Sequence, residues 1–404
     1  MKKKYNKILI VTHQFAPHQS PRTTRWKLIY DELIKGGNDV HIITGTPQDE
    51  IQSHVTYIGN KQASKVIKSL REQSKIQQKK FLRNLFLKFL KKLYRFFYKT
   101  FAWPDYTMFW VFAVWRNRKK IDLDYDLIIS VSLPFSSHLA AYILNKKNRK
   151  EWIMDIGDPF SLKSNAFENN KYLYKNLNYY YERKFYNLAS KIIFTHKEAL
   201  QAHKKFFGIN DEKLLVGNPI SSFNQKIYNI SKSYNYSSKP IIFGYFGILT
   251  KGVRTPKNVL NVLDVNNFIF NWYTNPDSKK LIEDCLINRD NHNYMDIVPR
   301  QEALIKMAGS IHCLLSIGNL NPNQLPSKII EYLSTGKPVI HFAEIENDPV
   351  YDLESSFNNL LIITNKDNIS EIEDSVNNLF SLVGDFNEKY FINNFTPQAL
   401  IKLI

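Results

Sequence analysis

Cysteine is scarce in this sequence of 404 residues. Only Cys285 and Cys313 occur, and neither belongs to a CxxC pair or to a cluster with histidine. Two isolated cysteines are typical of free thiols in a reducing cytoplasm, where we expect this protein to be. The same pattern gives no indication of a structural zinc site.

Glycine, proline and long hydrophobic runs are also few. The 14 glycines and 16 prolines are too few for a fibrous or low-complexity chain. No stretch of about 20 apolar residues occurs, so we expect no transmembrane helix. Residues 1–7 are basic, but the apolar run that follows, Ile8–Val11, is too short for the core of a signal peptide. The run is better explained as a buried first β-strand.

Acidic residues are nearly missing from one stretch. Residues 61–120 contain 17 lysines and arginines but only Glu72 and Asp105 as acids, a local charge of +15 out of +18 for the whole chain. Such a local block of one sign predicts a single anionic partner, either a lipid surface or a nucleic acid.

Within this stretch, residues 81–100 have the pattern of an amphipathic helix. One face of this predicted helix is aromatic and aliphatic and another is basic. This division is typical of a helix that lies in the plane of an anionic membrane. A core helix with a solvated basic face is the alternative. Nucleic-acid binding is disfavoured, because aromatic residues would then be interleaved with the basic ones. The two faces comprise Leu82, Phe86, Phe89, Leu93 and Phe96, and Lys88, Lys91, Lys92, Arg95 and Lys99.

The rest of the chain alternates short apolar runs with amphipathic segments. This alternation predicts an α/β fold with two doubly wound, Rossmann-like domains of parallel strands. We expect domains at 1–222 and 241–404, a polar linker at 223–240, and a last helix that packs back on the first domain. The predicted strands are Lys7–Val11, Val40–Thr44, Leu127–Val131, Trp152–Asp155, Ile192–Thr195, Ile241–Phe246, Phe268–Trp272, Tyr294–Ile297, Ile311–Leu315, Pro338–Phe342 and Leu360–Ile363.

Polar loops follow two strands of the first predicted domain. In parallel sheets ligands bind at the carboxyl ends of the strands, and the loop with His13 and Pro17 lies at such an end. Arg25 begins the next predicted helix, at the end where the dipole disfavours a cation, so an anion there would explain it. Asp155 and Asp158 follow another strand and could orient sugar hydroxyls; capping a turn is the alternative.

The second predicted domain opens with a strand and a basic loop that contains glycine. Gly247 begins the loop, Lys251 and Arg254 supply charge, and Pro256 fits a helix start. Backbone amides and cations in this arrangement can bind phosphate, although neither a Walker loop nor GxGxxG is present. A later helix should begin at Ser327 and stop at Gly336, with Glu331 on it.

The run from Pro326 to Ile340, PSKIIEYLSTGKPVI, resembles the donor-binding signature of group 1 glycosyltransferases, which are retaining enzymes of the GT-B fold. Three further segments are similar to motifs of that family, in the same order along the chain. They are the first strand with its Phe-Ala-Pro loop, the loop at 247–256, and the junction motif at 217–220. Pro104, Asp105 and Trp110 resemble a feature of members that act on lipid-linked glycans in surface-polysaccharide assembly.

The resemblance implies two domains facing a cleft and a role for each motif residue. Glu331 would bind the ribose hydroxyls, and Lys251 and Arg254 would hold the diphosphate and stabilise its charge as the sugar leaves, without a metal or other cofactor. Asp158 would act near the reacting sugar. The remaining donor-side residues would be Val298, Pro299 and Arg300 at the nucleobase, and Gly247, Asn323, Ser327 and Lys328 near the phosphates or sugar.

The implied reaction moves a sugar from a UDP- or GDP-linked donor to a lipid-linked glycan at the inner face of the cell membrane. The family motif has glutamate where this chain has Asn323. This departure keeps open a non-catalytic scaffold that binds sugar nucleotides at the membrane. A GT-B-type epimerase is a further alternative, against which the basic helix argues. No hydrolase-like carboxylate pair is evident, so a glycosidase is not expected.

Overall fold

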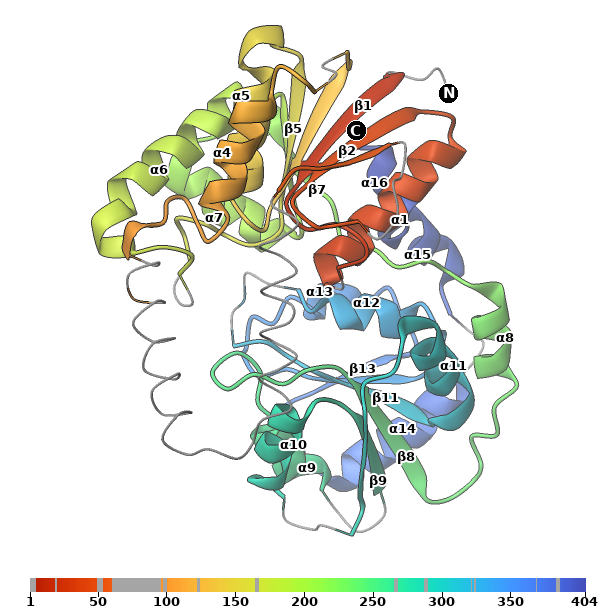
Figure 1. The fold of residues 1–404 in the computed structure, drawn as a ribbon. Coiled ribbons are helices and arrows are strands. Elements are labelled where there is room, and N and C mark those ends of the chain that lie inside the picture. Colours follow the sequence, from red (N-terminus) through yellow and green to blue (C-terminus); the bar gives the residue numbers. More distant parts are fainter. Residues whose placement is uncertain are drawn as a thin grey trace, which may run out of the picture. The chain divides into compact units, whose positions relative to one another are not determined.

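The computed structural model describes the chain except for residues 1–4, 19, 49–53, 60–95, 97–99, 122–123, 164–166, 265–267, 287–289, 321, 323–324, 368 and 383–385. The chain forms two compact units, one of residues Met1–Gly217 with Ile404 and the other of Asn218–Leu403. The division falls inside the junction motif at 217–220. Figure 1 shows a parallel sheet flanked by helices in each unit.

The described part of the first unit contains a seven-stranded sheet in the order β3-β2-β1-β4-β5-β6-β7, with every pair parallel. Its central strands are apolar on both faces, as parallel strands covered by helices must be. In β1, for example, every residue after Lys7 is buried. The strands are β1 Lys7–Thr12, β2 Asp39–Thr44, β3 Val55–Tyr57, β4 Leu127–Val131, β5 Glu151–Ile156, β6 Lys191–Phe194 and β7 Leu214–Val216.

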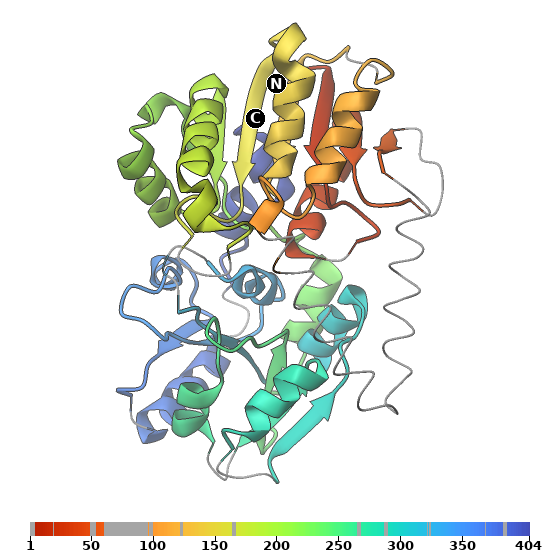
Figure 2. The same cartoon turned by 60° about the vertical axis from the view of Figure 1, so that its left-hand side comes forward.

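Helices cover both faces of this sheet. Helix α1 (Pro21–Lys35) is capped by Ser20, whose side chain accepts from the Thr23 amide, and it buries Trp26, Ile29 and Leu33. Among the described residues, four helices on the other face share one apolar core with the sheet, and Figure 2 shows the yellow α5 between the orange α4 and the green α6 in this layer. These helices are α4 Met108–Asn117, α5 Ser136–Asn148, α6 Lys171–Leu188 and α7 Lys197–Phe207; a 3-10 turn, η1, spans Asp211–Lys213.

The second unit repeats this architecture with a six-stranded parallel sheet in the order β10-β9-β8-β11-β12-β13 over its described residues. Separate apolar cores lie on its two faces. The strands are β8 Ile241–Phe246, β9 Phe268–Tyr273, β10 His292–Met295, β11 Cys313–Ile317, β12 Val339–Phe342 and β13 Leu360–Ile363. The helices are α8 Gln225–Lys232, α9 Lys257–Leu263, α10 Pro276–Glu283, α11 Arg300–Ser310, α12 Ser327–Leu333, α13 Tyr351–Glu354, α14 Ile369–Ser381, α15 Glu388–Phe395 and α16 Pro397–Ile401.

The predicted α/β fold with two parallel sheets is confirmed, but several element bounds differ. Helix α1 starts at Pro21 rather than Arg25, because Ser20 and Pro21 form its cap. The predicted linker contains helix α8, which Asn224 caps. The predicted strand at Tyr294–Ile297 begins two residues earlier, and the one at Ile311–Leu315 begins two residues later. Cys285 and Cys313 are free thiols, as expected.

Most of the predicted amphipathic helix at 81–100 lies outside the described residues. None of the described helices combines the length and the hydropathy that crossing a membrane requires.

Candidate functional sites at the two sheet edges

Each unit gathers polar residues at the edge where its parallel strands end. In the first unit this edge carries the loops that follow Thr12 of β1, Val131 of β4 and Ile156 of β5. In the second unit it carries the loops that follow Phe246 of β8, Tyr273 of β9 and Ile317 of β11. These are the positions where doubly wound sheets bind ligands.

Asp155 is the centre of a buried ion cluster in the first unit. One carboxylate oxygen accepts a 2.6 Å hydrogen bond from Trp26 Nε1 and lies 3.2 Å from an Arg22 Nη. The other oxygen is 3.7 Å from Arg25 Nη2, which also donates to the Gly217 carbonyl at 2.8 Å. Burial lowers the pKa of Arg25 to about 10 despite the Asp155 charge, and the guanidinium remains a cation.

Arg22 is the member of this cluster that reaches solvent. Arg25 and Asp155 are buried, whereas 16% of the Arg22 side chain is exposed. The Arg22 guanidinium also donates to the Ser132 and Asp155 carbonyls. Gly157 makes room for it, since a Cβ at that position would overlap the guanidinium. The cluster therefore presents a fixed cation at the edge, and Arg25 and Asp155 support it from beneath.

His13 lies at the same edge in an aromatic corner. Its ring is edge-on to Trp110 at 5.2 Å and to Tyr106 at 6.0 Å between centroids. Burial, and secondly the nearby His18, lower the pKa of His13 to about 4. The imidazole is consequently neutral at physiological pH, with a buried Nδ1 that has no hydrogen-bond partner in the described part of the chain. The neutral ring can donate a hydrogen bond to a ligand or accept one from it, but it has no positive charge with which to bind an anion.

Asp105 has a capping role in the structure. Its buried carboxylate accepts from the amides of Thr107 and Ser136, and from both of their hydroxyls. Because Ser136 is the first residue of α5, the acid caps that helix and joins it to the segment before α4. Burial raises the pKa of Asp105, although these four hydrogen bonds favour the ionised form.

The other predicted residues of the first unit lie near this edge. Asp158 is half-buried, two residues beyond the end of β5. Pro17 is exposed in the loop that follows β1.

In the second unit, the loop after β8 folds into a tight hairpin. Thr250 and Arg254 pair through backbone hydrogen bonds in both directions, at 3.2 and 2.9 Å, and Gly252 turns with φ 78°. Lys251 is thereby exposed at the tip. At the base of the loop, the Gly247 amide donates to the Tyr273 carbonyl and the Gly247 carbonyl accepts from Thr274. The loop is thus anchored to the end of β9.

Arg254 points back to the sheet edge from this hairpin. Its Nη2 donates to Asn319 Oδ1 at 2.8 Å, which links the loops after β8 and β11. Its Nε is buried and has no hydrogen-bond partner among the described residues. Part of the guanidinium thus keeps an unused donor.

Glu331 is held between two cations. Arg300 Nε donates to one carboxylate oxygen at 2.7 Å, and Lys328 Nζ donates to the other at 2.5 Å. Burial alone would raise the pKa of Glu331, but Lys328 and Arg300 together hold it below its usual value. Only 12% of this side chain is exposed. The structure therefore brings three of the predicted donor-side residues together as one charged cluster.

Tyr332 fixes the helix of Glu331 to the sheet edge. Its hydroxyl accepts from the Phe246 amide at 2.8 Å and donates to the Phe246 carbonyl at 3.2 Å, at the last residue of β8. Burial raises the pKa of Tyr332, and Glu331 and Arg254 act on it with opposite signs. Tyr332 thereby joins the helix that carries Glu331 to the end of the strand that the Arg254 hairpin follows.

The remaining donor-side predictions have simpler surroundings. Val298 packs against the core beside α11, Pro299 is exposed before that helix, and Ser327 is exposed at the start of α12. Asn323 lies outside the described residues.

Three contributors were not anticipated from the sequence. Each makes a hydrogen bond within one of the charged clusters. Arg22 donates to the Ser132 carbonyl, Asn319 accepts from Arg254, and the Ser221 hydroxyl accepts from Arg300 Nη2 at 3.1 Å. Arg22 had a signal, since it lies in the same basic motif as Arg25. Asn319 and Ser221 had none, because their partners are distant in the chain.

No protein-family model matches this sequence. No curated protein matches it either. Solved structures do resemble it over nearly the whole chain. Sucrose-phosphate synthase from Thermosynechococcus elongatus aligns with 98% of this chain and 97% of its own, at a TM-score of 0.64 and 11% identity. TarM aligns with 98% and 97%, at a TM-score of 0.61 and 12% identity. Anabaena HepE in complex with UDP-glucose aligns with 98% and 97%, at a TM-score of 0.58 and 13% identity. This likeness establishes the GT-B fold for the chain.

Proposed function

We propose that this protein is a glycosyltransferase. It transfers a sugar from a nucleotide-sugar donor, UDP- or GDP-linked, to a lipid-linked glycan acceptor in surface-polysaccharide synthesis, with retention of the anomeric configuration. The observation that carries the proposal is the edge of the second sheet. Glu331 lies there on the helix that Tyr332 bonds to the end of β8, and Arg254 lies in the hairpin that follows β8. The similarity to HepE, which was solved with UDP-glucose, supports the choice of donor class.

Each group at this edge matches one part of a nucleotide sugar. An ionised carboxylate accepts hydrogen bonds from ribose hydroxyls, which is the role proposed for Glu331. Lys251 and Arg254 can neutralise the diphosphate, since Lys251 is exposed at the loop tip and Arg254 is half-buried. Val298, Pro299 and Arg300 border the nucleobase in this arrangement. Gly247 allows close approach of the loop backbone.

The chemistry follows from the charges. When the bond between the anomeric carbon and the diphosphate breaks, negative charge accumulates on the diphosphate, and the fixed cations stabilise it more than they stabilise the ground state. The oxocarbenium-like carbon is then attacked by an acceptor hydroxyl on the face that the diphosphate leaves, and the hydroxyl proton passes to an oxygen of the departing diphosphate. The proposal assigns Asp158 to the reacting sugar, and it requires no metal.

The test is a thermal-shift screen of the full chain against UDP, GDP, TDP and their sugars. A ligand at 100 times its dissociation constant should stabilise the protein by about 2.7 kcal/mol, which is readily measured. The preferred nucleotide sugar is then incubated with a lipid-linked acceptor, and transfer is followed by mass spectrometry. The anomeric configuration of the product, read by NMR, tests retention.

Two outcomes would contradict the proposal. If no nucleotide raises the melting temperature, the donor site is wrong. If a nucleotide sugar binds but is never turned over, the protein is a binding scaffold of the same fold rather than an enzyme. Within an active enzyme, Asp158→Asn should lower turnover more than donor affinity, as loss of a transition-state contact does.

A further inference from the structure

Helix α6 has an outer face that is both apolar and basic. Five large apolar side chains are exposed on it, from 38% for Leu177 to 88% for Tyr172. Its exposed charges, Lys171, Lys175 and Arg183, are all positive, because its acid Glu182 is buried and bonded to Tyr186 and to the Ser161 amide. The apolar members are Tyr172, Leu173, Leu177, Tyr180 and Leu188.

Helix α4 has a similar outer face. Phe109, Phe112 and Trp115 follow one another at helical spacing and are exposed by 70%, 56% and 46%. Arg116 and the residues 118–120 that follow the helix are all basic. The Arg118 guanidinium lies 4.8 Å from the Trp115 ring, so the cation borders the aromatic surface.

The segment before α4 joins this helix to α6. Trp103 donates from its indole to Asn178 of α6 at 3.0 Å and packs on Tyr181 at 4.7 Å between ring centroids. The neighbouring Pro104 carbonyl accepts from Asn169, just before α6. Figure 2 places the two helices in one layer, on either side of α5. We call the exposed residues of α4 and α6 the aromatic–basic face.

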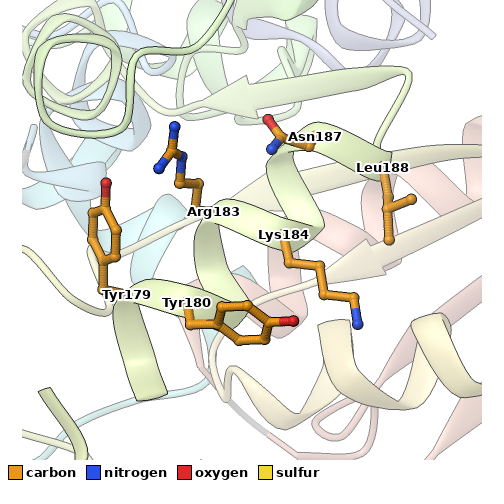
Figure 3. A pocket seen from close by; sticks show the side chains of 6 residues that line it. All are labelled: Tyr179, Tyr180, Arg183, Lys184, Asn187 and Leu188. Atoms are coloured by element: carbon orange, nitrogen blue, oxygen red, sulfur yellow. The ribbon is translucent and has the colours of Figure 1, made fainter. Parts of the chain in front are cut away.

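A shallow depression of about 430 Å³ lies on this face along α6 (Figure 3). Its rim carries two cations, Arg183 and Lys184, beside two tyrosine rings and a leucine. Lys184 Nζ lies 5.8 Å from the Tyr180 ring, so its charge rests against an aromatic surface. The lining residues are Tyr179, Tyr180, Arg183, Lys184, Asn187 and Leu188.

The charge pattern of this face selects its occupant. Aromatic rings and leucines bordered by lysines and arginines that form no ion pair with any described residue match the interface of an anionic bilayer. A second copy of the chain packed about a two-fold axis would set cations against cations. We infer that the aromatic–basic face docks the protein on an anionic lipid bilayer.

The inference rests on the proposed function in one respect, namely that docking would bring the protein to its lipid-linked acceptor. The face lies next to the first candidate site, because Tyr106, just before α4, and the buried Trp110 of α4 pack against His13. Docking itself needs no turnover. It can therefore be measured separately from donor binding and transfer.

The test is co-sedimentation of the full chain with vesicles of phosphatidylcholine, alone or with increasing phosphatidylglycerol, at low and high salt. One variant combines Lys171→Glu, Lys175→Glu and Arg183→Glu, and another combines Phe109→Ser, Phe112→Ser, Tyr172→Ser and Leu173→Ser. A matched control in the second unit combines Lys226→Glu, Lys232→Glu and Ile305→Ser, all of which are exposed. Circular dichroism and nucleotide binding check that each variant is folded.

The wild type and the control should bind anionic vesicles, and high salt should weaken this binding. The charge variant should lose at least tenfold in affinity, since one cation near an anionic surface is worth about a factor of five. The apolar variant should also lose at least tenfold, because its four side chains no longer bury apolar surface in the interface. Unchanged binding by both face variants would overturn the inference, as would loss only on changing Lys88, Lys91, Lys92 and Arg95 to Glu. A wild type that ignores anionic vesicles, but forms a dimer abolished by the face variants, would instead identify a protein interface.

Discussion

At the scale of single residues, Glu331 shows how neighbours decide the chemistry of a buried acid. Glu331→Gln keeps the shape of the side chain but removes its charge. Nucleotide affinity should fall about tenfold, measured by calorimetry, because a neutral amide is a weaker partner for ribose hydroxyls. Arg300 and Lys328 are 30% and 40% exposed, so water can solvate them and the free energy of unfolding should change by only about 1 kcal/mol. Normal nucleotide affinity would show that the cluster is structural.

Lys251 and Arg254 offer a second test at this scale. Replacing both with alanine should reduce affinity for the nucleoside diphosphate, because each charged hydrogen bond contributes on the order of 1.5–3 kcal/mol. Lys251→Ala alone is the cleaner variant, since Lys251 is exposed whereas Arg254 also holds Asn319. Lys257→Ala, an exposed lysine at the start of α9, serves as the control. Equal affinities for the double variant and the wild type would exclude these residues from the diphosphate site.

At the scale of elements, two glycines that end helices differ in their surroundings. Gly208 after α7 and Gly336 after α12 both have left-handed backbones, with φ of 64° and 71°. A Cβ at Gly208 would meet no atom within 4 Å, whereas one at Gly336 would overlap the Tyr228 ring. Gly208→Ala should cost about 1 kcal/mol from the backbone alone.

Gly336→Ala should cost more than Gly208→Ala in urea denaturation, because Tyr228 must also move. Equal losses for the two variants would mean that the ring moves aside freely. Adding Tyr228→Ala to Gly336→Ala separates the two contributions, since the ring is then absent.

At the scale of the whole molecule, stability should depend on pH through Lys337. This lysine is fully buried, donates to the Ile311 carbonyl at 2.6 Å and lies 3.5 Å from the Tyr234 ring centroid. Burial lowers its pKa to about 7, and Cys313 offsets only part of this shift. Between pH 7 and the usual lysine range near 10.4, the unfolded chain binds the proton and the folded chain does not. Folding stability therefore rises with pH in this window, and the full cost of the buried cation applies below it.

Lys337→Met should remove this dependence. Urea denaturation of the wild type should give a free energy of unfolding that rises by up to about 1.4 kcal/mol per pH unit above pH 7, relative to the variant. Lys257→Met should behave like the wild type. Parallel pH profiles for the wild type and Lys337→Met would mean that the Tyr234 ring and the Ile311 carbonyl keep the ammonium charged.

The sequence by itself determined the fold class and most of the strands. Strands buried on both faces must be apolar throughout, and that requirement leaves a readable run such as Ile8–Val11. In each sheet, loops that follow such runs lie at the same edge, so the sequence places His13 and Asp158 at strand ends of the first unit and Lys251 and Arg254 at a strand end of the second. Short elements were beyond this reasoning: β3 and β7 have three residues each, and α8 lies in a polar stretch.

Only the tertiary structure decided which members of a motif are buried. Arg22 and Arg25 are three residues apart on one helix, and packing against Asp155 covers Arg25 while leaving part of Arg22 in solvent. Likewise, the tyrosines and leucines of α6 have the composition of a core helix. Phe185 and Tyr186 pack into the core, whereas Tyr172 and Tyr180 are exposed on the outer side of the helix. Exposure depends on which partners the folded chain brings to each face, and those partners lie far away in the sequence.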